Sequence, residues 1–304
     1  MQGLSQQARR NIVRAPPPIS SPAILSVQSS VAYGHVGNAA AVFCLRRSGV
    51  DVWPVDTVAF SNHPGYGRYT GRVRPATEVG ELIEGLRCIG ALDRCGGVLS
   101  GYVGSADTGR IVHQTAQTLK TQRPSALWCC DPVMGDHDTG LYVPWNIVEF
   151  FRQTAVPAAD ILVPNSFELE LLTGLPTDTI AGATAAAAEL LTQGPQAVIV
   201  TSVNAAERGA GTISSLAVTR QGSWLVTTPR LLLAAKGAGD ALAALLFARL
   251  LSGASVPDAL AAAVSSIFAV IERTARAGSL ELCLVAAQEA LVDPCRRFAA
   301  EQLG

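Results

Sequence analysis

The chain has 304 residues, of which 49% are hydrophobic and 15% are charged, and its formal net charge is −1 at pH 7. This balance lacks the excess of basic residues that nucleic acids require, so we expect no nucleic-acid partner. The longest apolar runs, such as residues 241–251, are shorter than the roughly 20 residues of a membrane-spanning helix, so we expect no membrane partner. The apolar content instead suits a large α/β domain with a substantial core.

Residues 1–22 differ in composition from the rest of the chain. They contain Arg9, Arg10 and Arg14, no acidic residue, and a run of prolines at 16–18. They lack a continuous apolar segment of the secretory type, so we do not expect export. We predict a disordered, basic, proline-rich extension at 1–22 and a single ordered domain at 23–304, with organellar targeting by the extension as an alternative.

The seven cysteines indicate a reducing compartment. Their number is odd, none shows C-x-x-C spacing, and Cys129 and Cys130 are adjacent within an apolar run, which is a poor geometry for a mutual disulfide. We therefore expect free thiols and a cytoplasmic protein.

Strand-like and helix-like segments alternate along the ordered part of the chain. In order, the sequence predicts strand 23–27, helix 39–47, strand 52–60, helix 78–92, strand 97–100, helix 106–121, strand 126–130, a helix near 145–153, strand 161–163, helices 167–172 and 181–192, strands 197–201, 212–219 and 223–227, and helices 241–251, 257–274 and 280–291. Pro54 interrupts the second strand, which favours a sheet edge for it. The alternation is typical of a mainly parallel sheet covered by helices on both faces, with ligands at the carboxyl ends of the strands.

A glycine-rich turn, Lys236-Gly237-Ala238-Gly239-Asp240, comes directly before the predicted helix 241–251. Glycines let successive backbone N–H groups approach an anion, and the positive end of the helix would point at the same place. Asp240 could there take the proton of an attacking hydroxyl, so the turn is suited to moving a phosphoryl group onto an alcohol. On this motif alone, the alternative is a glycine-rich turn with an aspartate that caps a helix.

Acidic side chains follow two of the predicted strands. Asp131 and Asp136 follow the strand at 126–130, and Glu168 stands three residues after Asn165. Carboxylate and carboxamide oxygens suit Mg²⁺, which a phosphoryl donor needs to offset charge on its oxygens. The alternatives are a turn residue before Pro132 for Asp131 and a carboxylate in the first turn of a helix for Glu168.

Polar and aromatic side chains follow other strands. Ser29, His35 and Asn38 could orient a heterocyclic substrate. Three tyrosines in separate exit loops could stack on a flat ring, although each alone also fits a surface aromatic: Tyr33, Tyr66 and Tyr102.

Seven motifs run in one order along residues 24–291. They are Ser29 with Tyr33-Gly34-His35-Val36-Gly37-Asn38, Thr57 with Phe60-Ser61-Asn62-His63, Ser100-Gly101-Tyr102-Val103-Gly104-Ser105, Cys130-Asp131-Pro132-Val133-Met134-Gly135, Pro164-Asn165, Glu168-Leu169-Glu170 and Gly237–Asp240. In these motifs the chain resembles the pyridoxal kinases of the ribokinase superfamily. The G-x-G-D and N-x-x-E elements belong to the whole superfamily, whereas the Y-G-H-x-G-N run and the F-S-N-H loop are specific to pyridoxal kinases.

The resemblance implies a three-layer α/β/α sandwich of the ribokinase type with a mainly parallel sheet, usually a homodimer. It implies transfer of the γ-phosphate of ATP to the 5′-hydroxyl of pyridoxal, with Mg²⁺ and a monovalent cation such as K⁺. Asp240 would be the base, with an anion hole from Gly237, Ala238 and Gly239.

The resemblance also implies the remaining site residues. The substrate would contact Ser29, Thr57, His63, Pro64, Gly65, Tyr102 and Asp240. ATP would contact Asp131, Val163, Glu168, Thr201, Thr228, Lys236, Gly237 and Gly239. The metal would be held by Asp131, Asp136 and Glu168.

The chain departs from the family pattern at several positions. Pro64 and Gly65 stand where a substrate-contacting Thr is common, and Ser30 replaces a frequent His. Lys236 directly precedes the glycine motif and would be either a phosphate contact or a solvated loop charge. Two alternatives follow: a kinase for another hydroxymethyl heterocycle such as hydroxymethylpyrimidine, or a weakly active paralogue that binds pyridoxal or its phosphate.

Overall fold

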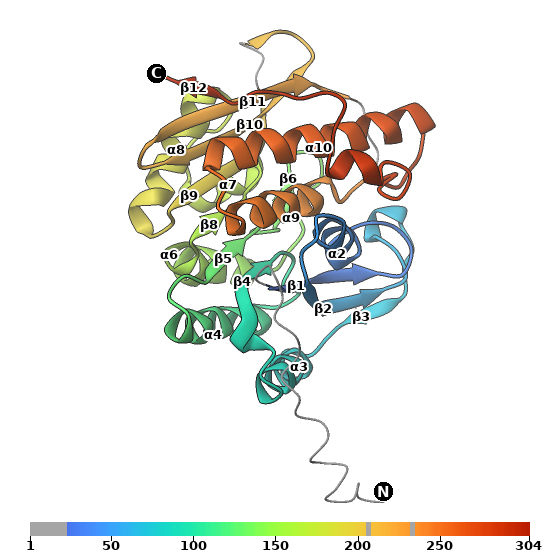
Figure 1. Ribbon diagram of the computed structural model, residues 1–304, viewed down its shortest axis with the longest axis vertical. Helices are drawn as coiled ribbons and strands as arrows, with labels where there is room; N and C mark the ends of the chain where they lie inside the picture. Colours follow the sequence, from blue (N-terminus) through green and yellow to red (C-terminus); the bar gives the residue numbers. More distant parts are fainter. Residues whose placement is uncertain (1–22, 205–207, 232–234) are drawn as a thin grey trace, which may run out of the picture.

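The computed structural model describes residues 23–204, 208–231 and 235–304, so the predicted extension at 1–22 lies outside the described residues. A ten-stranded sheet runs through the molecule (Figure 1). Its strands, in spatial order, are β12 (Glu301–Leu303), β11 (Gly222–Pro229), β10 (Thr212–Thr219), β9 (Ala197–Asn204), β8 (Ile161–Leu162), β5 (Leu127–Cys130), β4 (Cys95–Ser100), β1 (Ala23–Val31), β2 (Val52–Phe60) and β3 (Gly71–Val73). The six strands from β9 to β2 are mutually parallel, and the outer strands are antiparallel to their neighbours.

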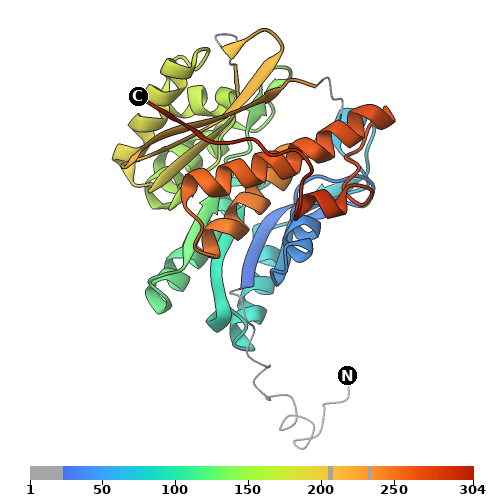
Figure 2. The ribbon, with the colours of Figure 1, turned by 45° about the horizontal axis from the view of Figure 1, so that its top comes forward.

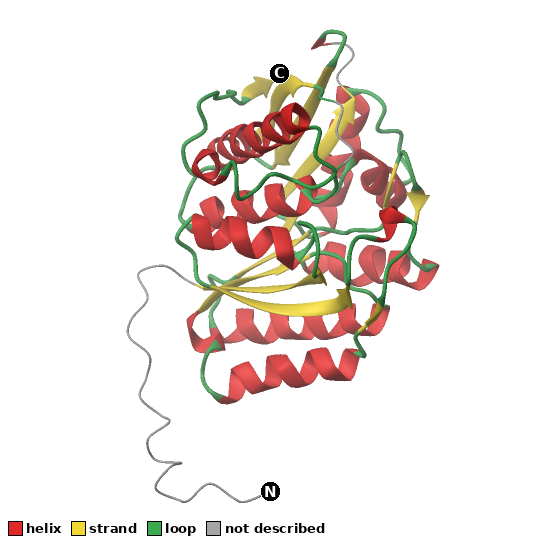
Figure 3. Ribbon diagram, turned by 90° about the vertical axis from the view of Figure 1, so that its right-hand side faces the viewer, coloured by secondary structure: helices red, strands yellow, loops and turns green. Residues whose placement is uncertain are grey.

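Helices cover both faces of the sheet (Figure 3), which confirms the predicted three-layer α/β/α sandwich. One face carries α2 (Asn38–Arg47), α9 (Ala238–Leu251) and α10 (Val256–Ala277). The other carries α3 (Ala76–Cys88), α4 (Ala106–Gln122), α5 (Trp145–Phe150), α6 (Val156–Ala158), α7 (Ser166–Thr173) and α8 (Ile180–Gln193). A two-stranded hairpin, β6 (Gly135–Asp136) and β7 (Gly140–Leu141), lies outside the main sheet.

The strands bury apolar side chains on both faces, as expected of a covered parallel sheet. Neighbouring residues alternate between the two cores: Ile24 packs with α2 and α9, whereas Leu25 packs with α3 and α4. Apolar transfer contributes about 25 cal/mol per Å² of buried apolar surface, so both layers are held mainly by this term.

Helix α9 is enclosed on every side, because it packs against the sheet, α2 and α10 (Figures 1 and 2). All eight residues from Ala241 to Ala248 are buried. A helix that is apolar all round belongs in a core, and its burial fixes where its first turn lies. That first turn is the Gly237–Asp240 motif.

The structure differs from the predicted elements near the C-terminus. Residues 280–291 do not form the predicted helix; α10 ends before Gly278, and a 3₁₀ turn at Gln288–Leu291 follows. Leu282 and Leu284 are buried while Leu280 and Val285 are exposed, so the buried residues alternate at this point instead of forming a helical stripe.

Two smaller differences concern the other predicted elements. The predicted helix near 145–153 ends as an α-helix at Phe150 and continues as a π-turn, Phe151–Ala155. The strand β2 is not an edge strand, because β3 pairs with its last residues, 58–60; Pro54 lies in the part that β3 does not cover.

Candidate active site

The first turn of α9 can only be built with glycine at position 237. Gly237 has φ +98°, in the left-handed region, and a Cβ there would lie 1.8 Å from the carbonyl oxygen of His35. The loop after β1 therefore presses directly on the start of α9. No described side chain caps this helix, so the N–H groups of its first turn face outward with the positive end of its dipole.

A second helix, α2, begins in the same way. Its N-cap is Gly37, with φ +54°, and a Cβ there would lie 2.1 Å from the carbonyl oxygen of Ser29. The two glycine-capped helix starts lie together, since α2 packs on α9. The structure thus places Ser29 beside the region that contains Gly237 and Asp240, although the sequence separates them by about 200 residues.

Asp240 lies in the first turn of α9 and is half-buried. Burial raises the pKa of its carboxyl to about 6, although the backbone N–H groups of Gly37 and of Asp240 itself act in the opposite direction. A carboxyl of this pKa is ionised at neutral pH and still basic enough to accept a proton. Its surroundings suit a general base.

Two buried carboxyls lie further along the same edge of the sheet. Asp131 follows β5 and is 7% exposed, and Glu168 lies in the first turn of α7 and is 2% exposed. Burial raises the pKa of Asp131 well above its ordinary range, and the charges of Glu168 and Asp240 raise it further. Burial likewise raises the pKa of Glu168. Two carboxyls that repel each other in a buried site are stabilised when a proton or a cation binds between them.

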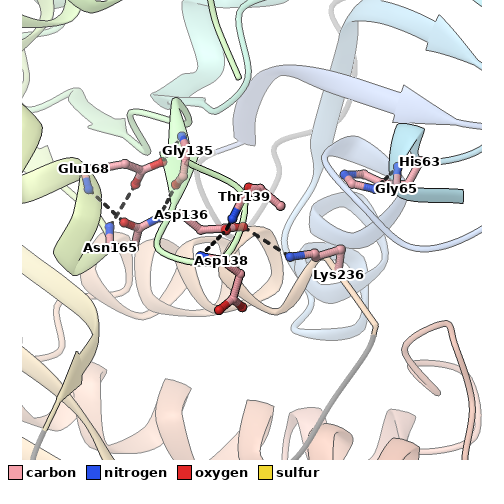
Figure 4. Close-up of polar contacts among 9 residues, drawn as sticks. All are labelled: His63, Gly65, Gly135, Asp136, Asp138, Thr139, Asn165, Glu168 and Lys236. Carbon is pink, nitrogen blue, oxygen red and sulfur yellow. Dashed lines mark hydrogen bonds and ion pairs between the residues drawn. The ribbon is translucent and has the colours of Figure 1, made fainter. Parts of the chain in front are cut away.

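Glu168 is held in place by backbone amides (Figure 4). Its carboxylate accepts hydrogen bonds from the N–H groups of Met134 (2.8 Å) and Asn165 (2.9 Å), and the Asn165 side chain accepts one from the N–H of Glu168 (2.9 Å). The Asn165 amide also donates to the carbonyl of Gly135 (2.8 Å). The N-x-x-E motif is therefore a capping box that joins α7 to the β6–β7 hairpin.

Lys236 is exposed and forms an ion pair with the β6–β7 hairpin. Its ammonium lies 3.2 Å from Oδ2 of Asp136, across from the β6–β7 hairpin (Figure 4). The other carboxylate oxygen of Asp136 accepts from the N–H of Asp138 (3.0 Å) and from the N–H and hydroxyl of Thr139 (2.7 and 2.8 Å). Burial raises the pKa of Asp136, but the bonds from Thr139 and Lys236 outweigh burial and leave it below its ordinary value.

The predicted metal ligands are therefore not gathered around one point. Among the residues that the structure describes, no group of three or more His, Cys, Asp or Glu side chains is arranged to hold a metal ion. Asp131 and Glu168 interact with each other, whereas Asp136 faces Lys236. The buried, mutually repelling pair at Asp131 and Glu168 is nevertheless the part of the donor set that fits a divalent cation.

The loop between β2 and β3 carries three of the predicted substrate residues. His63 caps the short 3₁₀ turn Pro64–Tyr66, and its Nδ1 accepts the N–H of Gly65 at 3.0 Å. Burial and the nearby Lys236 lower the pKa of His63, while Glu281 and Asp136 act in the opposite direction. Pro64 and Gly65 are exposed at the tip of this loop.

Thr57 and Tyr102 are brought together by a direct contact. The Thr57 hydroxyl, which is fully buried, donates to the backbone carbonyl of Tyr102 at 2.6 Å. Because this bond occupies the hydroxyl proton, Thr57 positions the loop after β4 instead of facing a ligand with that proton. Tyr102 itself is half-buried, and burial raises the pKa of its hydroxyl.

The predicted nucleotide residues lie at the far side of the same edge. Thr201 is half-buried and forms an isolated bridge with Asn165, and its N–H donates to the carbonyl of Pro164 at 2.9 Å. Val163 and Thr228 are buried, at 3% and 8% exposure. The residue after Thr201, Ser202, has φ +58°, the one left-handed non-glycine residue in the described ranges. Such strain is often found at ligand sites.

Sequence reasoning missed Tyr142 and the role of Asn38. Tyr142 is about half-exposed, and partial burial together with the charges of Glu168, Asp131, Asp240 and Asp136 raises the pKa of its phenol. Neither spacing nor periodicity singles this residue out, since it follows an irregular hairpin.

Asn38 is buried, at 3% exposure, and its side chain is engaged by the two neighbouring strands. Its Oδ1 accepts from the Ser26 hydroxyl (2.7 Å), and its Nδ2 donates to the carbonyl of Val55 (3.3 Å) and to the carboxylate of Asp56 (2.8 Å). It thus ties β1 to β2 just before the irregularity at 28–30 in their pairing, which precedes the loop with His35.

Two further features of the described residues concern the cysteines and the helix lengths. All seven cysteines are free, as predicted. Across the described ranges, no helix combines the length and the hydropathy needed to cross a bilayer.

Comparison with known proteins identifies the family. The family model described as phosphomethylpyrimidine kinase matches residues 96–283. The chain is 51% identical over 276 residues to pyridoxal kinase PdxY of Rubrobacter xylanophilus, covering 90% of this chain and 95% of that protein. It is 47% identical over 286 residues to pyridoxal kinase PdxY of Deinococcus radiodurans, with coverages of 92% and 96%.

A solved structure shows the same architecture. The pyridoxal kinase of Leishmania donovani in complex with ADP and pyridoxine superposes with a TM-score of 0.86 at 31% identity, covering 92% of this chain and 99% of that one. Fold, motifs and sequence identity agree, and the chain therefore belongs to the pyridoxal kinase family, with the ribokinase-like fold.

Proposed function

We propose that this protein phosphorylates pyridoxal: it transfers the γ-phosphoryl group of ATP to the 5′-hydroxyl of pyridoxal and releases pyridoxal 5′-phosphate and ADP. The observation that carries the proposal is the position of Asp240 at the glycine-lined start of α9, in a chain 51% identical to a pyridoxal kinase. Phosphoryl transfer depends mainly on positioning and on charge stabilisation, which such a site supplies.

In the proposed mechanism Asp240 is the general base. Its carboxylate accepts the proton of the 5′-hydroxyl as the oxygen bonds to the γ-phosphorus and the bond to the β-γ bridging oxygen breaks. The amides of Gly237, Ala238 and Gly239 and the dipole of α9 stabilise the negative oxygens of the transferred group. The raised pKa of Asp240 supports the role, because it brings the base close to the working pH.

The remaining residues bind the two substrates. We assign the pyridine side to Ser29, His63, Tyr102 and the backbone at Pro64 and Gly65, with Thr57 holding the Tyr102 loop. We assign the nucleotide side to Thr201, Thr228, the backbone near Val163, and Lys236. Lys236 would exchange Asp136 for a phosphate oxygen when ATP binds, which its half-exposed ammonium permits.

A divalent cation, which we propose to be Mg²⁺, would be held by Asp131 and Glu168, with Asp136 joining once Lys236 has turned to the phosphate. Bound there, it would offset charge on the phosphate oxygens. Family membership also supports a monovalent cation such as K⁺, a homodimer, residues 23–304 acting as one catalytic domain, and a cytoplasmic location.

A coupled ADP-release assay with Mg-ATP tests the function. We expect turnover with pyridoxal and a much lower kcat/KM with hydroxymethylpyrimidine, which the matching phosphomethylpyrimidine kinase model makes the second candidate. The reverse preference would favour that second function, and binding of pyridoxal without ADP release would indicate a non-catalytic paralogue. In the same assay, Lys236→Ala should raise the KM for ATP; an unchanged KM would remove Lys236 from the nucleotide site.

A further inference from the structure

Three segments that are remote in sequence meet at the carboxylate of Glu281. The backbone N–H of His35, in the loop between β1 and α2, donates to Oε2 of Glu281 at 3.1 Å. The hydroxyl of Tyr66, in the loop between β2 and β3, donates to Oε1 at 2.8 Å. One carboxylate thus joins the loop that packs on Gly237 to the loop that carries His63, Pro64 and Gly65.

The contact is close and well supported from both sides. Gly34 has φ +104°, and a Cβ there would lie 2.4 Å from Oε2 of Glu281, so a side chain at residue 34 would push this carboxylate aside. The Tyr66 ring also packs edge-on against Tyr33, with the ring centroids 6.1 Å apart. The hydrogen bond that the Tyr66 hydroxyl donates to Glu281 raises the pKa of that hydroxyl to about 12.

Glu281 itself is fixed by the segment after α10. Its N–H donates to the Ser279 hydroxyl (3.1 Å), which in turn donates to the carbonyl of Glu281 (2.7 Å). The N–H of Cys283 donates to the buried hydroxyl of Thr274, in the last turn of α10, at 3.0 Å. The carboxylate therefore extends from the fixed segment after α10 toward two loops whose bases are already joined by the hydrogen bond from the Tyr33 N–H to the Ser61 carbonyl (2.8 Å), and it adds a contact near the outer part of the second loop.

We propose that Glu281 is a positioning residue for the pyridoxal side of the site: it holds the loop at 61–70 closed against the loop at 32–37. Glu281 touches neither phosphate nor the reacting hydroxyl in this scheme. Its loss would leave the base and the anion hole intact but would let the loop with His63 move away. The inference rests on the proposed function for its kinetic consequence, whereas the holding of the loop does not depend on that function.

Kinetics of Glu281→Ala and Tyr66→Phe test the kinetic part. Tyr66→Phe, which removes one hydrogen bond to a charged group, should raise the KM for pyridoxal up to about tenfold, and Glu281→Ala, which removes that bond and the one from His35, should raise it at least as much, with kcat and the KM for ATP changed less than about twofold. The double variant should be no worse than Glu281→Ala, because both remove the same contact. Glu281→Gln should recover part of the loss, since an amide can still accept from His35 and donate to the phenol oxygen.

Glu289→Ala is the matched control. Glu289 lies in the same C-terminal segment and pairs with Arg47 at 2.5 Å, but it is exposed and remote from both loops, so its removal should leave all constants unchanged. An unchanged pyridoxal KM in Glu281→Ala would overturn the proposal. A fall in kcat with equal changes in both KM values would also overturn it, since that pattern indicates general loss of structure.

Hydrogen exchange on the free proteins separates this inference from the proposed function. Amides at 61–70 should exchange at least several-fold faster in Glu281→Ala than in the native chain, while those of α9 stay unchanged. Unchanged exchange at 61–70 would overturn the inference even in an active kinase. Faster exchange in a protein with no pyridoxal turnover would support the holding role and reject the proposed function instead.

Discussion

At the scale of single residues, folding and the proposed reaction favour different protonation states of Asp240. Its pKa is raised from 3.8 to about 6, so protonation favours the folded state, and the ionised carboxylate costs folding free energy above about pH 6. The proposed reaction requires the ionised form. The ionised form that the reaction requires therefore lowers the free energy of unfolding, as is common for catalytic groups.

Asp240→Asn should abolish nearly all turnover, because the amide cannot accept the hydroxyl proton, while the free energy of unfolding at pH 8 should be equal to or higher than that of the native chain. In the native chain, kcat/KM should fall as the pH drops below about 6. Thermal unfolding and pH–rate profiles measure both effects. A variant that keeps most of its kcat, or that unfolds far more easily at pH 8, would contradict this account.

At the scale of elements, the two glycines of the G-x-G-D turn are present for different physical reasons. Gly237 has φ +98° and no room for a Cβ beside the His35 carbonyl, whereas a Cβ at Gly239 would meet no other atom within 4 Å. Gly237 is thus required by the fold. Gly239 leaves the space in which a phosphate would approach the backbone.

Gly237→Ala should lower the free energy of unfolding by about 2 kcal/mol or more, since the clash is with backbone and the conformation is left-handed. Gly239→Ala should keep or slightly raise stability but lower kcat/KM for ATP, because a methyl group would enter the proposed phosphate site. Urea unfolding and steady-state kinetics on the two variants distinguish the roles. Equal loss of stability in both would refute the distinction.

The sequence predicted most elements and the edge of the sheet at which the candidate residues gather, because periodicity and glycine placement are local signals. It failed where contacts are remote. The segment at 280–291 looked helical by composition, yet Glu281 holds two loops from other parts of the chain. Asn38 looked like a substrate ligand, yet it joins β1 to β2 within the core. Such partners depend on packing, which one sequence does not reveal.

Across the whole molecule, the two ends of the parallel strands serve opposite purposes. At the carboxyl ends, the carboxyls of Asp131, Glu168 and Asp240 have raised pKa values and lack cationic partners among the described contacts. At the opposite edge, Asp160 is 6% exposed and accepts from Lys120 (2.8 Å), from the N–H of Trp128 (2.8 Å) and from Gln196 (3.2 Å). Its charge is fully compensated.

Asp160→Ala should therefore lower the free energy of unfolding by about 3 kcal/mol, since it leaves buried donors without an acceptor. The KM values for ATP and pyridoxal should not change, because the residue lies at the edge away from the site. Denaturant titration checks the predicted loss of stability, and steady-state kinetics check the unchanged KM values. A changed KM with unchanged stability would contradict this division of the sheet.

The enclosure of α9 has a consequence for the order of events in a catalytic cycle. A helix buried on all sides opens only when much of the domain opens, whereas the loop at 61–70, which borders the pyridine side, is largely exposed. Substrate exchange can then occur through the loops while the base and the anion hole keep their geometry. Each turnover would then begin with the reactive end already assembled, and only the loops would need to move between product release and the next chemical step.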